Sequence, residues 1–297
     1  MSNKIELQYL ETLRDVLENG YTKTDRTGVG TKSLFSKELT HHFEDGFPLL
    51  TTKHVSLKTV FTELKWFLLG RTDLKWLLER NCKIWVGDCY NFYLKHQDKN
   101  GIHSLSEEEF VQKIMTDFEF EQNWGDLGLI YGFQWRRSMN VDQIGNLIET
   151  IKNNPDSRRQ VVSAWNIAEL EHMLLPPCHY SFQTYVHDGY LDLKFNMRSS
   201  DLPLGLPFNI ASYGMLLLML CDMTKTKPHK LVASLGDYHI YTNQFEGVEE
   251  LLKRTPYNLP TLKLKECDYE DISDYEWEDF ELIGYKHHPK LYIPLSN

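Results

Sequence analysis

The chain has 297 residues, of which 41% are hydrophobic and 25% are charged, and its formal net charge at pH 7 is −10. This composition is ordinary for a globular protein, and the acidic balance gives no general attraction to nucleic acid or anionic lipid. The N-terminus has no apolar signal core, and the longest strongly apolar run, Met215–Leu220, is too short to span a bilayer. We therefore expect a cytoplasmic protein with neither a membrane nor a nucleic acid as partner.

The cysteines show no spacing typical of a metal site or of a disulfide framework. Their number is odd and no CxxC motif occurs, which predicts reduced thiols and no structural zinc. We expect no bound metal, and we expect most of the five to be inert core residues: Cys82, Cys89, Cys178, Cys221 and Cys267.

Two amphipathic helices are predicted in the N-terminal part of the chain. Apolar residues recur at helical spacing over residues 10–17 and 60–68, and Gly20 and Gly70 follow as C-terminal stops. The polar stretch at about 97–122, with a helical pattern around Glu107–Met115, is predicted to be a peripheral insertion.

Strands and helices alternate in the C-terminal half. The segment QTYVHDGYLDLKF predicts a β-hairpin with a tight turn at Asp188-Gly189. A long apolar helix is predicted from about Ile210 to Met223, and a strand over roughly Leu231–Leu235. The acidic segment ECDYEDISDYEWEDFE carries aromatic residues and is expected to form an exposed strand-and-turn region.

This mixture of elements lacks a regular βαβ rhythm, which favours an α+β fold around one main sheet. No repeat or Gly/Ser linker interrupts the sequence. We therefore predict a single domain over residues 1–297.

Cys178 is the candidate nucleophile. It follows two prolines, which fix the backbone before the thiol, and a polar-aromatic strand sequence comes after it. Guanidinium groups nearby would favour the thiolate, and Arg158, Arg159 and Arg198 are candidates for this role. A structural Cys-His pair explains the same spacing, so the residue pattern alone leaves both interpretations open.

An anion site is the second candidate. Arg26 lies within DRTGVGT, where a Gly-containing turn and flanking hydroxyl groups suit a phosphate. A surface turn explains this motif equally well. The groups that could surround one dianion are Arg26, Arg158, Arg159, Arg198 and Ser199.

Two further motifs offer polar groups for recognising a ligand. On a strand, His239 and Tyr241 would point to the same face, and both could bond one sugar hydroxyl. Asn209 could match the adjacent carbonyl and ring N–H of a uracil. The structural alternatives are a half-buried polar strand face for the first motif and a helix cap for the second.

Together these motifs resemble the thymidylate synthase family over nearly the whole chain. The segments that carry the resemblance occur in the family's order: DRTGVGT, FPLLTTK, ELKWFLLG, YGFQW, DSRRQVVSAWN, LPPCH, RSSDLPLGLPFNIASY, GDYHIYTN and GYKHHPKLYIP. The resemblance implies a homodimer with a large mixed β-sheet at the subunit interface and flanking helices. It also implies dUMP as the substrate and 5,10-methylenetetrahydrofolate as the one-carbon donor, with no metal.

The resemblance assigns roles to individual residues. Cys178 would attack carbon 6 of the uracil, with Arg198 also among the catalytic groups. Asn209 would read the base, and His239 and Tyr241 would hold the ribose hydroxyl. The phosphate would be bound by Arg26, Arg198 and Ser199 of one subunit and by Arg158 and Arg159 of the other.

Further matches concern proton transfer and the folate. Glu63, Tyr131 and His179 match residues that order water and assist proton transfers. Asp201 would bond the pterin, and the other positions matched around the folate are Lys53 (at the glutamate tail), Trp85, Leu204 and Phe208.

The chain departs from the family's usual pattern at several positions. Met197 replaces a glutamine, Gln244 replaces a histidine, Phe133 and Val86 replace polar residues, and the C-terminus Leu295-Ser296-Asn297 is polar. A polar end could admit water near the reactive methylene group, as in the related hydroxymethylases. We therefore expect a thymidylate synthase, with a dUMP hydroxymethylase as the alternative and a catalytically weak RNA-binding homologue as a third class.

Overall fold

The structure is a computed structural model that describes residues 3–24, 28–97 and 104–296. The described residues group into two compact units. The sheet unit comprises Met1–Phe61, Gly145–Val162 and Cys178–Ser296, and the helical unit comprises Thr62–Ile144 and Ser163–Pro177. The fold class is α+β with a mixed sheet, as predicted.

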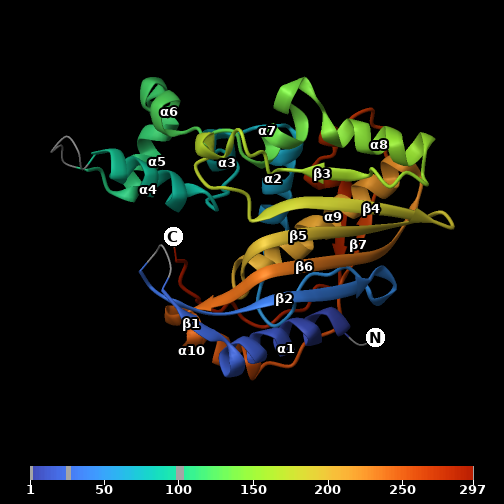
Figure 1. Ribbon diagram of the computed structural model, residues 1–297, viewed down its shortest axis with the longest axis horizontal. Coiled ribbons are helices and arrows are strands. Elements are labelled where there is room, and N and C mark those ends of the chain that lie inside the picture. The colour runs from blue at the N-terminus through green and yellow to red at the C-terminus, as the bar shows by residue number, and fades with distance from the viewer. Residues whose placement is uncertain (1–2, 25–27, 98–103, 297) are drawn as a thin grey trace. The chain divides into compact units, whose positions relative to one another are not determined.

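A six-stranded sheet with the order β1-β2-β6-β5-β4-β3 forms the centre of the sheet unit (Figure 1). Strands β5 and β6 are parallel, whereas β1–β2, β2–β6 and β4–β5 pair antiparallel. The strands are β1 (Tyr21–Lys23), β2 (Thr31–His42), β3 (Val161–Ser163), β4 (His179–His187), β5 (Tyr190–Asp201) and β6 (Lys227–Tyr241). A separate antiparallel pair consists of β7 (Thr261–Leu264) and β8 (Phe280–Ile283).

One face of the sheet packs on helix α9 (Gly205–Thr224), which lies behind β5 and β6 in Figure 1. Along β5 the side chains of Leu191, Leu193 and Phe195 are buried, while those of Asp192 and Lys194 alternate with them and are half-buried. This period of two assigns one face of the sheet to the core. The other face carries Tyr185, which is 65% exposed.

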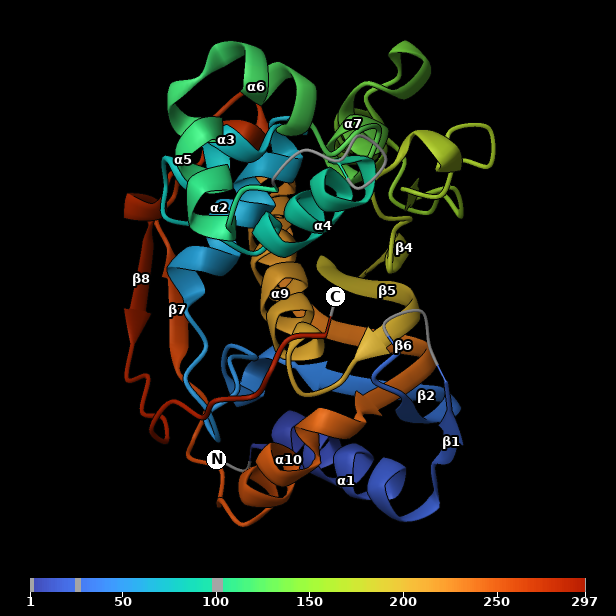
Figure 2. The ribbon, with the colours of Figure 1, turned by 90° about the vertical axis from the view of Figure 1, so that its left-hand side faces the viewer.

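The helix α9 is long and apolar enough to cross a membrane, but 78% of its apolar window is buried inside the structure. It behaves as a core helix of the sheet unit. Helix α1 (Lys4–Asn19) packs on β2 and contacts α10 (Phe245–Leu252), as Figure 2 shows.

The helical unit contains short helices with a shared aromatic core. The Tyr93 ring contacts two others there: its centroid is 5.4 Å from that of Phe110 and 5.2 Å from that of Trp124. Helices α4 (Val86–Gln97), α5 (Glu107–Thr116) and α6 (Phe118–Trp124) are packed together in Figure 2. The remaining helices of the chain are α2 (Leu57–Leu68), α3 (Leu74–Leu78), α7 (Tyr131–Arg136) and α8 (Gln143–Asn153).

Several predicted elements are confirmed. The two N-terminal helices are α1 and α2, the helical pattern near Glu107 is α5, and the predicted apolar helix is the central part of α9. The hairpin turn is also confirmed, since Asp188 and Gly189 both adopt positive φ, at 48° and 78°.

Strand β6 is much longer than predicted, because Gly236-Asp237 does not end it. Asp237 pairs with Phe35 on one side and with Ser199 on the other. A Cβ at Gly236 would lie 3.0 Å from the carbonyl oxygen of Met197, so glycine here permits close approach of the neighbouring strand.

The acidic segment near the C-terminus is not fully exposed, contrary to the prediction. Ile272 and Tyr275 have no exposed surface, and Tyr275 donates its hydroxyl hydrogen to the carboxylate of Asp222 on α9. Phe280 packs on Phe61, with ring centroids 5.4 Å apart. The aromatic residues of this segment anchor it to the core, while its carboxylates remain outside.

Candidate active site

Cys178 lies immediately before β4 and is half-buried and unoxidised. Its carbonyl oxygen accepts a hydrogen bond from the backbone N–H of Arg198 at 2.9 Å. By contrast, Cys82 and Cys221 are buried, and burial raises the pKa of each thiol to about 12. These two cysteines lie in the core and hold little thiolate at neutral pH, whereas the backbone of Cys178 is paired with that of Arg198.

His179 is buried beside Cys178 and shares a hydrogen bond of 2.9 Å with the hydroxyl of Tyr213 on α9. Burial lowers the pKa of His179 to about 3, so its imidazole is neutral at physiological pH. The Tyr213 ring in turn stacks on Phe195, with centroids 4.3 Å apart. Sequence reasoning missed Tyr213, although it belongs to the IASY motif.

The predicted anion ligands occupy different parts of the sheet unit. Arg198 is exposed and Ser199 half-buried, and they are consecutive on β5 next to Cys178. Arg158 and Arg159 are exposed in the turn between α8 and β3. Arg26 lies outside the described residues.

The turn that carries Arg158 and Arg159 is distant from Cys178 in the same chain. The carbonyl oxygen of the next residue, Gln160, accepts the N–H of Thr184 at 3.0 Å, which places the turn beside β4. Thr184 is six residues from Cys178 in the sequence, and a strand advances about 3.3 Å per residue, so the separation along β4 is roughly 20 Å. An arginine side chain cannot span that distance, so these guanidinium groups do not reach Cys178 within one chain.

Asp201 ends β5 and organises the start of α9. One carboxylate oxygen accepts the backbone N–H of Leu204 at 3.2 Å, and the other accepts a hydrogen from the Gln244 amide at 3.3 Å. Burial raises the pKa of Asp201 above its ordinary value. Lys53 is buried nearby and donates to the carbonyl oxygen of Pro203.

Burial also lowers the pKa of Lys53 to about 8, with the charge of Asp201 opposing that shift. Lys53 therefore faces the turn between Asp201 and α9. Its assignment to the folate's glutamate tail stays a prediction.

Asn209 is the fifth residue of α9 and not its cap, so the capping interpretation is wrong. The helix starts at Gly205, and a Cβ at that glycine would lie 3.8 Å from Oδ1 of Asn209 and 3.9 Å from the Cβ of Asp201. Asn209 and Asp201 are therefore both neighbours of Gly205. Phe208 precedes Asn209 on α9 and is half-buried.

His239 and Tyr241 lie on the same face of β6, as their spacing predicts, with ring centroids 5.2 Å apart. His239 pairs directly with Asp201 of β5, and its ring Nδ1 is 3.0 Å from the carboxylate of Asp237. This bond is the main reason why the pKa of Asp237 is lowered. Sheet register thus brings the predicted ribose ligands next to the predicted pterin ligand.

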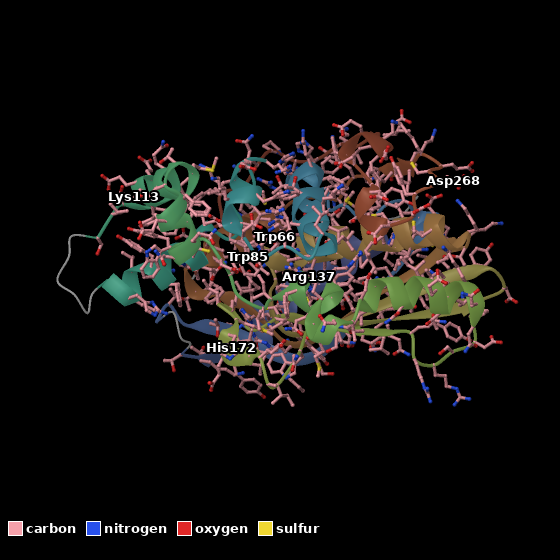
Figure 3. All side chains as sticks on the ribbon, turned by 90° about the horizontal axis from the view of Figure 1, so that it is seen from above. Trp66, Trp85, Lys113, Arg137, His172 and Asp268 are labelled. Carbon is pink, nitrogen blue, oxygen red and sulfur yellow. The ribbon has the colours of Figure 1, made fainter. Side chains whose placement is uncertain are left out.

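Three predicted residues come together in the helical unit. The indole N–H of Trp85 donates to Glu63 at 2.9 Å, and the Tyr131 ring lies 6.1 Å from that of Trp85. Trp66 packs beside Trp85, with centroids 6.3 Å apart (Figure 3). Burial raises the pKa of Glu63 to about 7, against the opposing effect of the Trp85 bond.

A carboxyl group with this pKa can both donate and accept a proton near neutral pH. Glu63 is therefore suited to general acid–base chemistry. The aromatic surroundings supply the desolvation on which the pKa depends.

The departures from the family's pattern have defined surroundings. Met197 is buried on β5 opposite His179, and Val86 is buried at the start of α4. Phe133 lies under the guanidinium of Arg137 at 5.6 Å.

Gln244 is fully buried and makes three hydrogen bonds. Its amide nitrogen donates to Asp201 and, at 3.1 Å, to the carbonyl oxygen of Pro294, while its amide oxygen accepts the N–H of Tyr241 at 3.1 Å. Sequence reasoning recognised the departure at this position but not the contact with the C-terminal segment.

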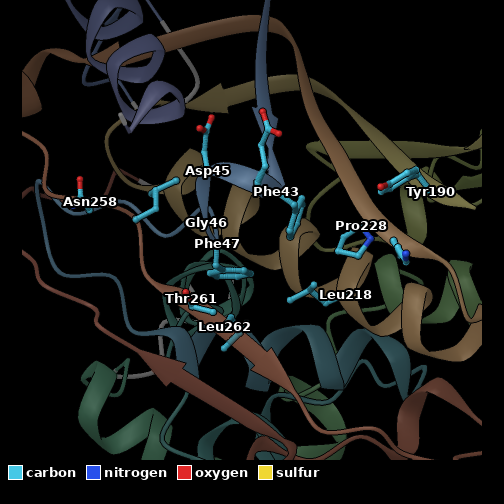
Figure 4. A pocket seen from close by; sticks show the side chains of 13 residues that line it. Phe43, Asp45, Gly46, Phe47, Tyr190, Leu218, Pro228, Asn258, Thr261 and Leu262 are labelled. Carbon is cyan, nitrogen blue, oxygen red and sulfur yellow. The ribbon is translucent and has the colours of Figure 1, made fainter. Parts of the chain in front are cut away.

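A pocket of about 750 Å³ opens elsewhere in the sheet unit (Figure 4). Its lining includes Phe43, Phe47, Tyr190 and Leu262. None of the predicted site residues that the structure describes lines it, so this pocket is separate from them.

The sequence is similar to a known protein family over almost its whole length. A family model described as thymidylate synthase matches residues 7–297. A protein of Mesoplasma florum named thymidylate synthase is 45% identical over 285 residues, covering 96% of this chain and 97% of that protein. A protein of Mycoplasma mobile with the same name is 45% identical over 284 residues, with coverage of 96% and 97%.

Proposed function

The chain belongs to the thymidylate synthase family and is a methyltransferase, and from this premise we propose how its residues carry out the reaction. It transfers a one-carbon unit from 5,10-methylenetetrahydrofolate to carbon 5 of dUMP, giving dTMP and dihydrofolate. The thiolate of Cys178 adds to carbon 6 of the uracil, and carbon 5 then attacks the folate methylene. Carbon 5 then loses its proton while the bond between the methylene and the folate nitrogen breaks, which leaves an exocyclic methylene on the base and frees tetrahydrofolate. Hydride from the tetrahydrofolate reduces this methylene to the methyl group as the thiolate of Cys178 departs, giving dTMP and dihydrofolate.

The observation that carries this proposal is the register of the strands around Cys178. The backbone bond from Arg198 to Cys178 supports a thiol held beside an exposed cation, which favours the thiolate and can hold the substrate phosphate. The neutral His179 next to it contributes no charge at physiological pH.

Recognition of dUMP would use the cluster at the ends of β5 and β6 and the start of α9. Asn209 donates to a uracil carbonyl oxygen and accepts the ring N–H, while His239 and Tyr241 hold the ribose hydroxyl. Their proximity to Asp201 supports a folate pterin bound next to the base.

Glu63 is the proposed acid–base group. Its pKa of about 7 leaves comparable populations of the two protonation states at neutral pH, as proton transfer to and from the pyrimidine requires. Trp85 and Tyr131, which surround it, are proposed to contact the folate and to assist the proton transfers.

We further propose that the enzyme works as a homodimer with shared sites. A separation of roughly 20 Å along β4 keeps Arg158 and Arg159 away from Cys178 of their own chain, so a phosphate at Cys178 would need Arg158 and Arg159 of the partner subunit. The exposed Tyr185 on the outward face of the sheet suits an interface between two copies.

Product analysis tests the proposed reaction. Purified protein is incubated with dUMP and methylenetetrahydrofolate, the nucleotide product is identified by mass, and dihydrofolate is followed by its absorbance. We expect dTMP and dihydrofolate in equal amounts. A protein that converts no dUMP, or that releases a nucleotide without dihydrofolate, would contradict the proposal.

A further inference from the structure

Two histidines and an aspartate converge on the outward face of the sheet, away from the residues of the proposed active site. His187 ends β4, Asp192 lies on β5 and His229 lies on β6, three strands that run side by side (Figure 1). All three side chains are half-buried. No part of the proposed reaction uses them.

Three specific atoms of this cluster face one another. Nε2 of His187 is 3.3 Å from Nδ1 of His229 and 3.6 Å from Oδ1 of Asp192. Nδ1 of His229 is 2.7 Å from the same carboxylate oxygen. The three donor atoms thus form a small triangle with one oxygen and two ring nitrogens at its corners.

These distances fit the coordination shell of a small divalent cation. Zinc binds histidine nitrogen and carboxylate oxygen at about 2.0–2.2 Å, and tetrahedral geometry then sets neighbouring donor atoms roughly 3.3 Å apart. Two of the three separations, 3.3 Å and 3.6 Å, lie within about 0.3 Å of this value. The third, a hydrogen bond of 2.7 Å, must lengthen by about 0.6 Å when an ion replaces the proton.

Charged groups of both signs lie beside the cluster. The ammonium of Lys230 lies 3.4 Å from Oδ2 of Asp192, so it engages the oxygen that is not part of the triangle. The carboxylate of Asp188 is 4.0 Å from Nδ1 of His187, on the opposite side of that ring. The His42 ring lies 5.6 Å from that of His229, centroid to centroid, and is an additional imidazole within reach of the site.

We propose that His187, Asp192 and His229 form a binding site for a late first-row divalent cation, with Zn²⁺ as the reference ion. Two imidazoles and one carboxylate are donors that such ions prefer, and water would complete the shell. The ion links three adjacent strands, so its role is to stabilise the hairpin end of the sheet. The cysteine spacing gave no sign of it, because the ligands are 5 and 37 residues apart and meet only through the pairing of β4, β5 and β6.

Zinc titration of chelator-treated protein tests the site. Isothermal calorimetry should give one zinc per chain with a dissociation constant in the micromolar range, about what three protein ligands provide. His187→Ala, His229→Ala and Asp192→Asn should each weaken binding at least about tenfold, since each removes one ligand. Thermal unfolding should shift to higher temperature with zinc in the wild type and not in these variants.

Two matched controls make the result specific. His96→Ala removes a histidine of the helical unit and should bind zinc like the wild type, and Cys178→Ser should do so as well, which separates the site from the free thiol. Asp192→Asn keeps the side-chain shape, so its unfolding temperature without zinc reports whether the sheet is intact. No heat of binding in the wild type overturns the proposal, as does equal affinity in the wild type and the folded Asp192→Asn variant.

Discussion

The backbone N–H of Arg198 donates to the carbonyl oxygen of Cys178 across 2.9 Å. This bond continues the β4–β5 ladder to the residue just before β4, so strand register sets the backbone of Cys178 against that of Arg198. The proposed effect of Arg198 on the thiol therefore depends on two residues whose backbones are already paired.

Cys178→Ser should lower the turnover number with dUMP by roughly three orders of magnitude or more, because a serine hydroxyl is far less ionised than a thiol. Binding of dUMP, measured by calorimetry, should change little, since the hydroxyl keeps the shape of the side chain. Cys267→Ser, which alters the other half-buried cysteine, should have normal kinetics. Near-normal turnover of Cys178→Ser is incompatible with the covalent mechanism.

Asn209→Asp should lower kcat/KM for dUMP at least about a hundredfold, because an ionised carboxylate cannot donate to the uracil carbonyl. The same change should allow some reaction with dCMP, whose amino group can donate to the carboxylate. Steady-state kinetics with the two nucleotides measures both effects. A wild-type protein that already prefers dCMP would show that the base assignment is wrong.

Mixing two inactive variants tests the shared site. The Cys178→Ser chain keeps its arginines and the Arg158→Glu chain keeps its nucleophile. One of the two sites in a mixed dimer therefore has both an intact Cys178 and an intact Arg158. Random mixing in equal amounts should restore about a quarter of the wild-type activity per chain. If mixed dimers form, as native mass spectrometry can show, and activity does not return, the arginines are not shared.

The sequence predicted those turns and helix ends that depend on the backbone preferences of a few neighbouring residues. The turn at Asp188-Gly189 and the stop at Gly20 depend on backbone preferences of the residues themselves, and both were found where expected. The full length of β6 was not predictable in this way, because the strand continues through Gly236 only where Leu235 and Asp237 on either side of it pair with β2 and β5.

In the candidate site, too, the sequence motifs identified individual residues but not the contacts that tertiary packing creates between them. Motifs identified Cys178, Asn209 and Asp201, and the pairing of β4 with β5 and the start of α9 after Asp201 determine where these residues lie. The partners Tyr213 and Gln244 were missed as contacts, since each is distant in sequence from the residue that it holds. Burial, which shifts the pKa of Glu63 to about 7, is likewise a property of packing and not of the motif.

Glu63→Gln should change how stability depends on pH. The ordinary pKa of 4.5 applies in the unfolded chain and about 7 in the folded one, so the folded state binds more protons between these values. Wild-type stability therefore falls as pH rises through this window, by on the order of 3 kcal/mol in total, whereas the neutral glutamine escapes that loss.

Urea unfolding of both proteins at pH 4.5 and pH 8 measures this difference. The free energy of unfolding of Glu63→Gln, relative to the wild type, should be higher at pH 8 than at pH 4.5. Glu119→Gln, a change on an exposed helix of the same unit, should show no such trend. A constant difference between Glu63→Gln and the wild type at the two pH values would show that Glu63 titrates normally. Turnover of Glu63→Gln should also fall sharply, because its amide cannot transfer a proton.

The last prediction concerns the C-terminal segment and the exclusion of water. Gln244 donates to both Asp201 and the carbonyl oxygen of Pro294, and the hydroxyl of Ser296 donates to Asn243 at 3.1 Å. One buried amide thus joins the proposed pterin ligand to the end of the chain. Gln244→Leu removes both donations, and Gln244→Glu additionally places a carboxylate against Asp201.

Both variants should raise KM for the folate, about tenfold for Gln244→Leu and more for Gln244→Glu because of the like charges. The wild type should give mainly dTMP with equimolar dihydrofolate. In the variants, water should compete with hydride for the exocyclic methylene, and a product heavier than dTMP by one oxygen should increase without a matching rise in dihydrofolate. Gln112→Leu, at an exposed position of α5, serves as the control and should match the wild type. Unchanged folate KM and unchanged products in both Gln244 variants would show that the contact between Asp201 and the C-terminal segment has no part in the reaction.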